Sequence, residues 1–431
     1  MRTGARLRAA AEVLDDVLGR HRPAALALAD WGKSHRFAGS GDRNAIGGLV
    51  YDALRRRSSI AWALGEDSPR ALAIGAAASA LAIPIEEVVA ACDGSGHALE
   101  PLSEAECAGL TRSLATAPPH IQADVPEWLW PAFVASFGES AVEEGRMLAV
   151  RAPTDVRVNG LKATRERVLK ALGEFGAAPT RLAPHGVRIP PPVGAARTAN
   201  LQAEAAFQAG WFEIQDEGSQ IAAALAGAGP REQVLDLCAG GGGKTLAMAS
   251  EMQNTGQIYA YDGDRLRLKP IFERLKRAGV RNAQVLRGGD EAAVTALGPR
   301  FDVVLVDAPC TGTGVWRRRP EAKWRLKPGN IADRVAEQAA ILDVAGGLVR
   351  PGGRLVYVTC SLLEEENGGT VGRFLAAHTE YTAKAPEDVV ATRLPGVALA
   401  SAVRSQRALT LTPYRHGTDG FFVAVLERRP G

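Results

Sequence analysis

The chain has 431 residues, of which 46% are hydrophobic and 23% charged, and its formal net charge is +3. This length predicts two or three domains, and the composition is that of a soluble globular protein. Because the net charge is small for the length, only local clusters of charge can argue for a nucleic-acid partner.

Several classes of protein are disfavoured at once. The longest nearly apolar run, 71–85, is shorter than the roughly 20 residues that span a bilayer, so we expect no transmembrane helix. The N-terminus lacks the apolar core and cleavage site of a secretory signal. The five cysteines are an odd number without a C-x-x-C pair, which argues against a disulfide framework and a zinc ribbon. We therefore expect a cytoplasmic protein with reduced thiols and no metal, and a monomer by default.

Residues 1–125 are alanine-rich and predict an all-α domain. One helix is expected over 5–20, and a second runs from Asp42, as its N-cap, to Arg57. Three arginines, 55–57, close the second helix. A solvated face with a favourable charge at the helix C-terminus explains them as well as a phosphate-contacting patch does.

Residues 126–200 form a second stretch of the chain. A strand is expected at 155–158 and a helix near 164–175. Three prolines at 190–192 form a stiff extended spacer, which is typical of a domain boundary.

In the third region, 201–431, short β-rich runs alternate with helical patterns. This alternation predicts an α/β domain with a parallel, doubly wound sheet. The expected strands are 233–237, 257–261, 283–286, 301–306 and 354–359.

A glycine-rich loop joins the first of these strands to a helix. Such a turn lets the backbone approach a ligand closely and points free N–H groups at it. A P-loop would need glycine where this chain has Cys238, and the dinucleotide fingerprint fits loosely, so an adenosine-bearing methyl donor is the third alternative. The loop residues are Cys238, Ala239, Gly240, Gly241, Gly242, Gly243 and Lys244.

Acidic residues after the next two strands favour the methyl donor. Asp262 stands at the tip of the second strand, where a ribose diol is hydrogen-bonded in doubly wound folds. The alternative is that Asp262 or Asp264 caps the next helix. Asp290 follows the third strand, where it could accept a hydrogen bond from the adenine amino group.

Two cysteines follow the fourth and fifth strands. Asp307 and Cys310 come after one, and Cys360 comes after the other. The ligand crevice of an open α/β sheet lies outside the carboxyl ends of its strands, so these groups should converge there. Taken singly, each cysteine is more often a buried small hydrophobe, but the shared position favours a chemical role.

This arrangement suits methylation of a pyrimidine. Cytosine C5 becomes nucleophilic when a thiolate adds to C6, and a second group must then help to remove the C5 proton. Asp307 would hydrogen-bond the base near N3 and N4. A thiol with a pKa of about 8.5 needs nearby cationic groups to ionise at neutral pH. Chemistry alone does not decide which cysteine attacks.

A segment rich in basic and aromatic residues follows Cys310. It contains Glu321 as its one acid and comprises Trp316, Arg317, Arg318, Arg319, Lys323, Trp324, Arg325 and Lys327. Basic groups interleaved with aromatics are typical of nucleic-acid contacts, which we favour over a solvated loop.

Together these motifs resemble the RNA cytosine-C5 methyltransferases, and within them the bacterial 16S ribosomal RNA branch called RsmB, Sun or Fmu. The most specific matches are the run 307–314 and the tripeptide 359–361, followed by 364–367. The glycine loop also matches, and 215–220 and 417–422 are weaker matches. The resemblance covers most of the chain.

The resemblance implies a Rossmann-like class I methyltransferase domain that uses S-adenosyl-L-methionine. Residues 238–244 would wrap the methionine part of the cofactor, Asp262 would bind the ribose and Asp290 the adenine. Asp307 would lie near both cofactor and base. Cys360 is then the nucleophile, and Cys310 assists product release. The stretches 128–129 and 157–159 resemble the family's linker subdomain, and the N-terminal helices resemble its NusB-type RNA-binding domain.

The chain departs from the family pattern in its cofactor loop. Gly240 and Gly241 stand where the family has Ala-Pro, which should make the loop more flexible and weaken cofactor binding. Two alternatives to 16S rRNA methylation stay open. One is the same chemistry on tRNA, another RNA or DNA, and the other is a NusB-like assembly factor that binds RNA without modifying it.

Overall fold

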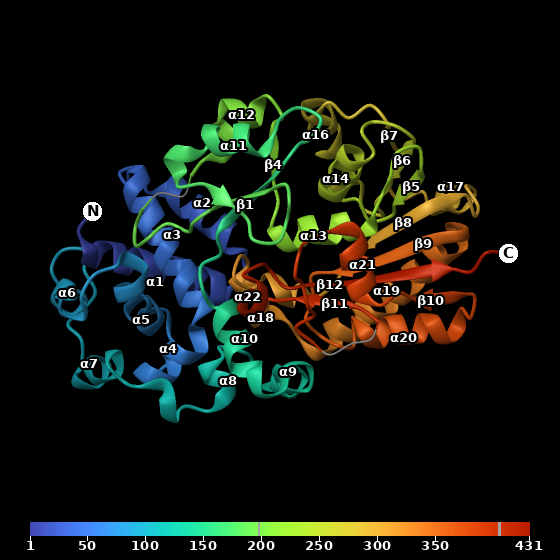
Figure 1. Cartoon of the computed structure of the whole chain (residues 1–431). Helices are drawn as coiled ribbons and strands as arrows, with labels where there is room; N and C mark the ends of the chain where they lie inside the picture. The colour runs from blue at the N-terminus through green and yellow to red at the C-terminus, as the bar shows by residue number, and fades with distance from the viewer. Residues whose placement is uncertain (197–198, 404–406) are drawn as a thin grey trace. The chain divides into compact units, whose positions relative to one another are not determined.

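The computed structural model describes residues 1–196, 199–403 and 407–431 (Figure 1). Contacts between Cα atoms divide the chain into two units. The first, which we call the helical unit, comprises 1–152, 191–199 and 315–326, and the second, the sheet unit, comprises 153–190, 200–314 and 327–431. Both units contain stretches that are far apart in sequence. The consecutive limits 1–125, 126–200 and 201–431 therefore stay a prediction.

The helical unit is built around three helices. α1 (Thr3–Gly19), α3 (Ser40–Arg55) and α5 (Pro69–Leu81) pack on one another through fully buried side chains such as Leu7, Leu49 and Leu72. The other helices of the unit are α2 (Ala24–Ser34), α4 (Arg57–Leu64), α6 (Ile85–Ala91), α7 (Glu104–Leu110), α8 (Pro119–Gln122), α9 (Trp130–Phe137), α10 (Ala141–Leu148) and α18 (Pro320–Arg325).

The first two predicted helices are present, but the expected N-cap is wrong. α3 begins at Ser40 with Gly39 as its N-cap, so Asp42 lies in the first turn. Its carboxylate accepts a hydrogen bond from Arg6 Nε at 3.0 Å. An acid in the first turn stabilises the helix through the macrodipole and here also ties α3 to α1.

The main sheet of the sheet unit has 8 strands among the described residues, in the order β10-β12-β9-β8-β5-β6-β7, with β11 paired to β12. Figure 1 shows the central strands side by side. The pairs from β7 to β9 are parallel and those made by β12 are antiparallel. The strands are β5 (Gln233–Asp236), β6 (Gln257–Ala260), β7 (Ala283–Val285), β8 (Phe301–Asp307), β9 (Val349–Thr359), β10 (Tyr381–Ala383), β11 (Leu409–Leu411) and β12 (Phe421–Arg428).

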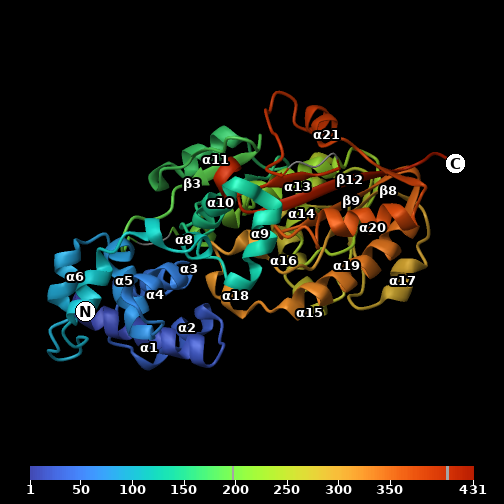
Figure 2. The ribbon, with the colours of Figure 1, turned by 90° about the horizontal axis from the view of Figure 1, so that it is seen from below.

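Helices cover both faces of this sheet, as a doubly wound fold requires. Successive residues of β8 point to opposite faces, so Val303 and Leu305 pack with α13 (Glu217–Ala226) and α14 (Gly243–Glu251). Val304 and Val306 pack with α19 (Pro328–Leu348) and α20 (Gly368–Ala377), which lie side by side in Figure 2. The remaining helices of the main fold are α15 (Arg265–Leu268), α16 (Ile271–Ala278), α17 (Glu291–Thr295), α21 (Pro386–Arg393) and α22 (Pro413–His416).

The five predicted parallel strands are therefore confirmed. The antiparallel strand β12 was not expected, and it makes the sheet mixed rather than wholly parallel.

A second, four-stranded sheet has the order β2-β3-β1-β4. Its strand β1 (Thr154–Val158) and helix α11 (Arg165–Ala171), which is capped by the Thr164 side chain, confirm the elements expected there. Its other elements are β2 (Ala178–Pro179), β3 (Gly186–Ile189), β4 (Phe212–Ile214) and α12 (Ala205–Gln208). In the described ranges we find no helix with the length and hydropathy needed to cross a membrane.

Candidate active site

Two thiols lie at the carboxyl ends of neighbouring strands. β8 ends at Asp307 shortly before Cys310, and β9 ends at Thr359 immediately before Cys360. β8 and β9 pair in parallel, so both segments leave the sheet at the same edge. The two Sγ atoms lie 3.4 Å apart, and both side chains are partly exposed. The structure thus brings together the two cysteines that the sequence indicated.

The thiols of Cys238 and Cys310 both have a raised pKa, for partly different reasons. Burial and the carboxylate of Asp262 raise the pKa of the Cys238 thiol well above its usual value. The hydrogen bond with Cys360, together with burial, raises the pKa of the Cys310 thiol. Cys310 therefore holds its proton more tightly than a free cysteine does.

A buried carboxylate joins the two cysteine loops. Glu366 is 0% exposed, and one oxygen accepts hydrogen bonds from Thr311 N at 2.9 Å and Gln338 Nε2 at 3.0 Å. The other oxygen accepts from the hydroxyls of Thr311 and Ser361. Because these two residues directly follow Cys310 and Cys360, one side chain fixes both loops. The sequence showed Glu366 only as part of a matching motif, since its partners are far along the chain.

A salt bridge connects the glycine loop to β8. Lys244 Nζ lies 2.6 Å from Asp307 Oδ2, and Lys244 is buried while the Asp307 side chain is 36% exposed. Lys244 Nζ also lies 5.5 Å from the centroid of the Phe421 ring. The carboxylate of Asp307 is therefore held in place at the end of β8 and is still partly exposed. The predicted contact of Lys244 with the methionine part of a cofactor stays a prediction.

A cavity of about 390 Å³ opens beside the glycine loop. Its volume falls within the range of small-molecule sites, roughly 300 to 1,000 Å³. Two of the predicted cofactor residues, Cys238 and Asp262, line it, and so does Glu291, which the sequence did not single out. Other lining residues are Leu237, Tyr261, Gly263, Asp264, Arg267, Pro309, Glu337 and Ile341.

The three acids after β6 and β7 have different roles. Asp264 caps α15 by accepting from Leu266 N at 2.8 Å. Asp262 instead accepts from Gly240 N and from Asp264 N, each at 2.8 Å, so it is not the helix cap. Asp290 caps α17 through Ala293 N at 3.1 Å and does not line the cavity. The ribose role of Asp262 and the adenine role of Asp290 stay predictions.

Two glycines of the glycine loop are needed for different steric reasons. Gly240 and Gly242 have φ values of +50° and +83°, which disfavour other residues. A Cβ at Gly242 would lie 2.5 Å from Ile271 of α16, whereas the nearest atom to one at Gly240 is 3.8 Å away. Gly242 is therefore required for close packing. At Gly240 only the backbone conformation opposes a side chain.

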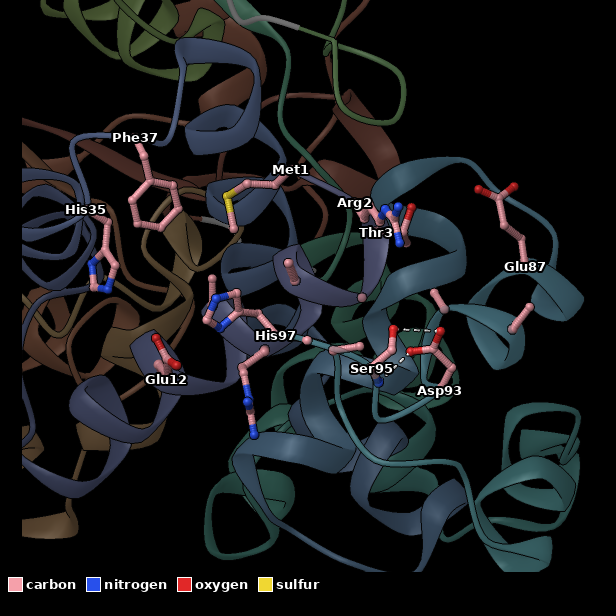
Figure 3. Close-up of a pocket in the computed structure, with 18 of the residues that line it drawn as sticks. Met1, Arg2, Thr3, Glu12, His35, Phe37, Glu87, Asp93, Ser95 and His97 are labelled. Carbon is pink, nitrogen blue, oxygen red and sulfur yellow. Dashed lines mark hydrogen bonds between the residues drawn. The ribbon is translucent and has the colours of Figure 1, made fainter.

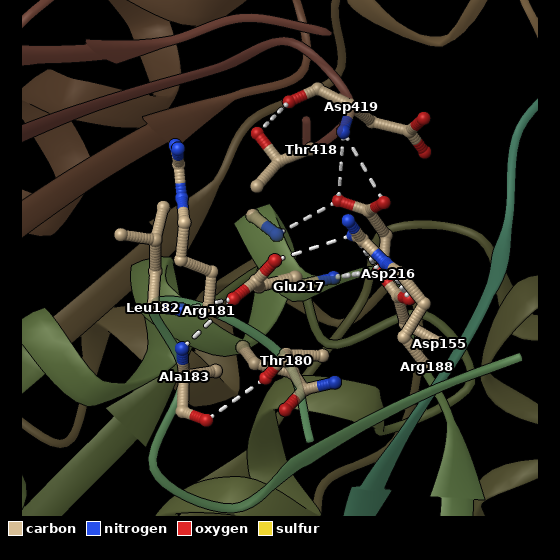
Figure 4. Close-up of polar contacts among 12 residues, drawn as sticks. Asp155, Thr180, Arg181, Leu182, Ala183, Arg188, Asp216, Glu217, Thr418 and Asp419 are labelled. Atoms are coloured by element: carbon tan, nitrogen blue, oxygen red, sulfur yellow. Dashed lines mark hydrogen bonds and ion pairs between the residues drawn. The ribbon is translucent and has the colours of Figure 1, made fainter. Parts of the chain in front are cut away.

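The two weaker sequence motifs meet in the structure (Figure 4). Asp419 N donates to the Asp216 carboxylate at 3.1 and 3.2 Å, so the segment before β12 is tied to the start of α13. The next residue, Gly420, donates its N–H to Gly314 O at 2.8 Å. A Cβ on Gly314 would lie 2.3 Å from Gly420 O, so the contact needs glycine. Motifs that looked independent thus hold the end of the Cys310 loop.

The basic and aromatic segment does not have the expected exposure. Trp316 and Lys323 are 1% exposed and Arg317 is 3% exposed, and all three lie within the helical unit. The prediction that they contact nucleic acid is wrong for these residues, and so is the alternative of a solvated loop. Arg319 and Lys327 are exposed, and for them RNA contact stays a prediction.

The arginine run at the end of α3 is also different from both expectations. Arg55 is buried and pairs with Asp52 at 2.6 Å, while Arg57 pairs with Asp67 at 2.7 Å. Neither explanation of the run, a solvated face or a phosphate patch, holds for Arg55.

The helical unit has a cavity of its own, of about 990 Å³ (Figure 3). Residues of both charges line it. Arg2 and Arg8 are basic, and Glu12, Glu87 and Asp93 are acidic. This mixture does not favour a polyanion such as RNA. Over the parts of the chain that the structure describes, no cluster of His, Cys, Asp or Glu could hold a metal ion.

Comparison with known proteins agrees with this geometry. A family profile described as 16S rRNA methyltransferase RsmB/F matches residues 223–427. A probable ribosomal RNA small subunit methyltransferase B from Synechocystis sp. is 32% identical over 311 residues, which are 71% of this chain and 67% of that protein. The chain belongs to the RsmB/F family.

Other methyltransferases B align with this RsmB/F chain to a similar extent. The probable enzyme of Bacillus subtilis is 32% identical over 74% of this chain and 68% of its own length. That of Sodalis glossinidius is 32% identical over 70% of this chain and 65% of its own. The chain thus spans about two thirds of the length of these relatives. The expected enzyme class, an rRNA methyltransferase that uses S-adenosyl-L-methionine, is confirmed at the level of the family.

Solved structures confirm the fold class. PH0851 matches over 99% of both chains with a TM-score of 0.73 and 26% identity. NSun6 from Pyrococcus horikoshii, solved with SFG, matches 71% of this chain and 99% of its own with a TM-score of 0.62 and 22% identity. An all-α N-terminal region followed by a Rossmann-like methyltransferase domain is therefore the fold of this RsmB/F chain.

Proposed function

We propose that this chain transfers a methyl group from S-adenosyl-L-methionine to C5 of a cytosine in RNA, and that its substrate is 16S ribosomal RNA. The observation that carries the proposal is the 3.4 Å separation of the Cys310 and Cys360 sulfur atoms at the strand edge that also carries Asp307. Family membership supports the substrate class. A ribosomal RNA substrate also implies a cytoplasmic location in bacteria.

The cavity beside the glycine loop suits an adenosine-bearing methyl donor. Carboxylates of Asp262 and Glu291 line it and can accept hydrogen bonds from ribose and adenine donors. The backbone that follows Cys238 is held by hydrogen bonds from Ala239 N to Tyr261 O and from Gly240 N to the Asp262 carboxylate. When bound, the cofactor supplies an electrophilic sulfonium methyl group.

Cys360 is the nucleophile in this proposal. Its thiolate adds to C6 of the cytosine, and the electron pair of the C5=C6 bond becomes available at C5 for attack on the methyl group. The methyl group bonds to C5 as its bond to the donor sulfur breaks. Cys310, 3.4 Å away, accepts the C5 proton as a thiolate, and the C5–H electron pair restores the C5=C6 bond while the bond from C6 to the Cys360 sulfur breaks. Because the pKa of Cys310 is raised, its thiolate is a strong base for the C5 proton once its own proton has passed to solvent.

Asp307 stabilises the base during addition. Its partly exposed carboxylate, fixed by Lys244, can accept hydrogen bonds from the cytosine N4 amino group and from a protonated N3. Because the carboxylate is already oriented, little reorganisation is needed when positive charge develops on the ring.

RNA recognition by residues 1–125 is part of the proposal, with 126–200 as a linker subdomain. Its support is the resemblance of the N-terminal helices to NusB-type domains. A second candidate function, RNA binding without modification, lacks a comparable observation, because the thiols, Asp307 and the cavity are all present.

Two measurements test the function. Bisulfite sequencing of total RNA from cells with and without the gene should reveal one lost 5-methylcytosine in 16S rRNA. Loss of a site in tRNA instead would redirect the proposal to another RNA. Purified protein should also transfer labelled methyl groups to unmodified 16S rRNA, and cofactor binding in calorimetry without any transfer would favour the assembly-factor alternative.

A further inference from the structure

The glycine loop contains four consecutive glycines, 240–243. Glycine loses more conformational entropy on ordering than other residues do, so a run of four needs contacts from outside the loop to hold one conformation. The loop, α16 and the four-stranded sheet all belong to the sheet unit. The contacts among them therefore lie within one compact unit.

Helix α16 contacts the loop at two points. Arg274 donates a hydrogen bond from Nη1 to Gly241 O at 2.7 Å. Three residues earlier, the side chain of Ile271 lies 2.5 Å from where a Cβ on Gly242 would be. The peptide that joins Gly241 to Gly242 is also held at its N–H, which donates to Ala239 O at 2.8 Å. Both polar groups of this peptide thus have partners.

The Arg274 guanidinium is itself fixed by a second partner. Its Nε and Nη2 donate to one carboxylate oxygen of Glu213, in β4, at 3.2 and 3.1 Å. Glu213 is buried, and Arg277 pairs with the other oxygen of its carboxylate. Because a guanidinium is planar, the contact with Glu213 sets the direction in which Nη1 of Arg274 points.

A second arginine holds the end of the loop. Arg157, in β1, donates from Nη1 to Gly243 O at 2.7 Å and to the side-chain oxygen of Gln215. Arg157 is buried, and burial lowers its pKa to about 10, so its guanidinium is still charged at neutral pH. The four-stranded sheet therefore supports two carbonyl groups of the loop, one through Arg157 and one through Arg274.

The supported backbone leads directly to the cavity beside the loop. Gly240 N donates to the Asp262 carboxylate at 2.8 Å, and both Cys238 and Asp262 line the cavity. Gly240 directly precedes Gly241, so a displacement of Gly241 passes to the residue that orients Asp262. The contact at Gly241 O is thus one residue away from the wall of the cavity.

We propose that Arg274 is a positioning residue that orders the glycine loop before the cofactor binds. Its contact with Gly241 O fixes the backbone in the conformation that presents Cys238 and Asp262 to the cavity. Less ordering is then left to take place on binding, which raises affinity. The inference rests on the proposed function for the identity of the ligand, S-adenosyl-L-methionine, but not for the order of the loop itself.

The variant Arg274→Met tests this role against Arg277→Met as a matched control. Each change removes one of the two guanidinium groups that pair with Glu213 and keeps an apolar stem. In the described contacts, Arg274 is the one of the two that donates to a loop carbonyl. Calorimetry measures the dissociation constant of S-adenosyl-L-methionine. We expect it to rise about 10-fold in Arg274→Met, because the loop must then be ordered at the moment of binding, and to stay within about twofold in Arg277→Met.

Methyl transfer separates a role in cofactor binding from a general loss of structure. At saturating cofactor, kcat of Arg274→Met should stay within about twofold of that of the natural chain, while the KM for the cofactor rises. A mutation that raises KM and leaves kcat unchanged has removed binding that the ground state and the transition state share.

A second measurement needs no cofactor. Amide hydrogen exchange of the cofactor-free protein, followed by mass spectrometry, should be about fivefold faster in peptides covering 238–244 of Arg274→Met than in those of the natural chain. Peptides of the central strand β8 report global unfolding and should exchange at the same rate in both proteins. If Arg274→Met does not fold, Arg274→Lys keeps the charge beside Glu213. It should shift both readouts in the same direction by about threefold, because an ammonium lacks the planar fork that reaches both partners.

An unchanged dissociation constant together with unchanged exchange of the loop in a folded Arg274→Met protein would overturn the inference. Equal losses of affinity in Arg274→Met and Arg277→Met would also overturn it, because both variants would then act through Glu213. If the natural chain binds no S-adenosyl-L-methionine, the proposed function fails at its cofactor, and the exchange of the loop alone decides whether Arg274 orders it.

Discussion

The strand-end cysteines and the basic and aromatic segment 316–327, which closely follows Cys310, had different outcomes: sequence reasoning succeeded for the cysteines and failed for the segment. Cys310 and Cys360 were placed together because parallel strands deliver their carboxyl ends to one edge of a sheet. The segment 316–327 was assigned to RNA because basic residues alternate with tryptophans, and the structure buries Trp316 and Lys323 instead. Topology constrains position directly, whereas composition leaves open which surface, if any, a side chain reaches.

The position of the two strand-end cysteines, the part of the comparison that the sequence predicted, is tested most strongly at Glu366. This side chain joins the two cysteine loops. Glu366→Gln keeps the size of the side chain but replaces one acceptor oxygen by a donor, which conflicts with the donors of Thr311, Ser361 and Gln338. We expect kcat to fall by about 100-fold, as for other changes that shift reacting groups by about 1 Å. Steady-state assays of methyl transfer by the natural chain and by Glu366→Gln measure this change in kcat.

The neighbouring Glu365 provides the control for this variant. It is exposed, and Glu365→Gln makes the same chemical change. Equal activities of the two variants would mean that Glu366 does not position the thiols.

A buried acid behind the cofactor loop gives a pH prediction. Burial raises the pKa of Asp236 to about 7, although Thr245 donates a hydrogen bond to it at 2.6 Å. Because the folded chain binds this proton more tightly than the unfolded one, its contribution to stability is present at low pH and is lost as pH rises towards 7. Titration of Asp236 should lower the free energy of unfolding of the natural chain by about 2 to 3 kcal/mol between pH 5 and pH 8. Asp236→Asn should not show this loss, because an amide does not titrate.

Urea unfolding of the natural chain and of Asp236→Asn at both pH values measures this difference. Parallel stability changes in the two proteins would show that Asp236 does not titrate in this range.

The two unusual glycines should respond oppositely to alanine. Gly240 has a positive φ, so Gly240→Ala should lower the free energy of unfolding by about 1 kcal/mol. Gly241 is not in that conformation, and its nearest neighbour is the flexible end of Arg274, so Gly241→Ala should raise stability by about 0.5 kcal/mol. Thermal unfolding compares them, and equal effects would contradict the loop geometry.

The smallest effect is expected for the salt dependence of RNA binding. A lysine that neutralises a phosphate of single-stranded RNA contributes about 0.7 to the slope of log K against log salt. Since Lys323 is buried, Lys323→Met should leave that slope unchanged in filter-binding assays. A loss of one such contribution would show that this side chain reaches RNA.

Much of the sheet unit could be predicted because it rests on local patterns. The parallel strands, the glycine loop, Asp262 and both cysteines follow from short runs of residues. The antiparallel strand β12, the role of Glu366 and the contact of Gly314 with Gly420 depend on partners far apart in sequence, which no local pattern encodes. The burial of Arg55 and Lys323 was missed for the same reason, since each is satisfied by carbonyl groups from another part of the chain.

The central claim is that Cys360 attacks the base and Cys310 assists release. Cys310→Ala and Cys360→Ala proteins are each mixed with S-adenosyl-L-methionine and unmodified 16S rRNA, and covalent complexes are resolved on denaturing gels and mapped by mass spectrometry. The account predicts an RNA adduct through Cys360 in Cys310→Ala and none in Cys360→Ala. An adduct through Cys310 in Cys360→Ala, with none in the other variant, would contradict it.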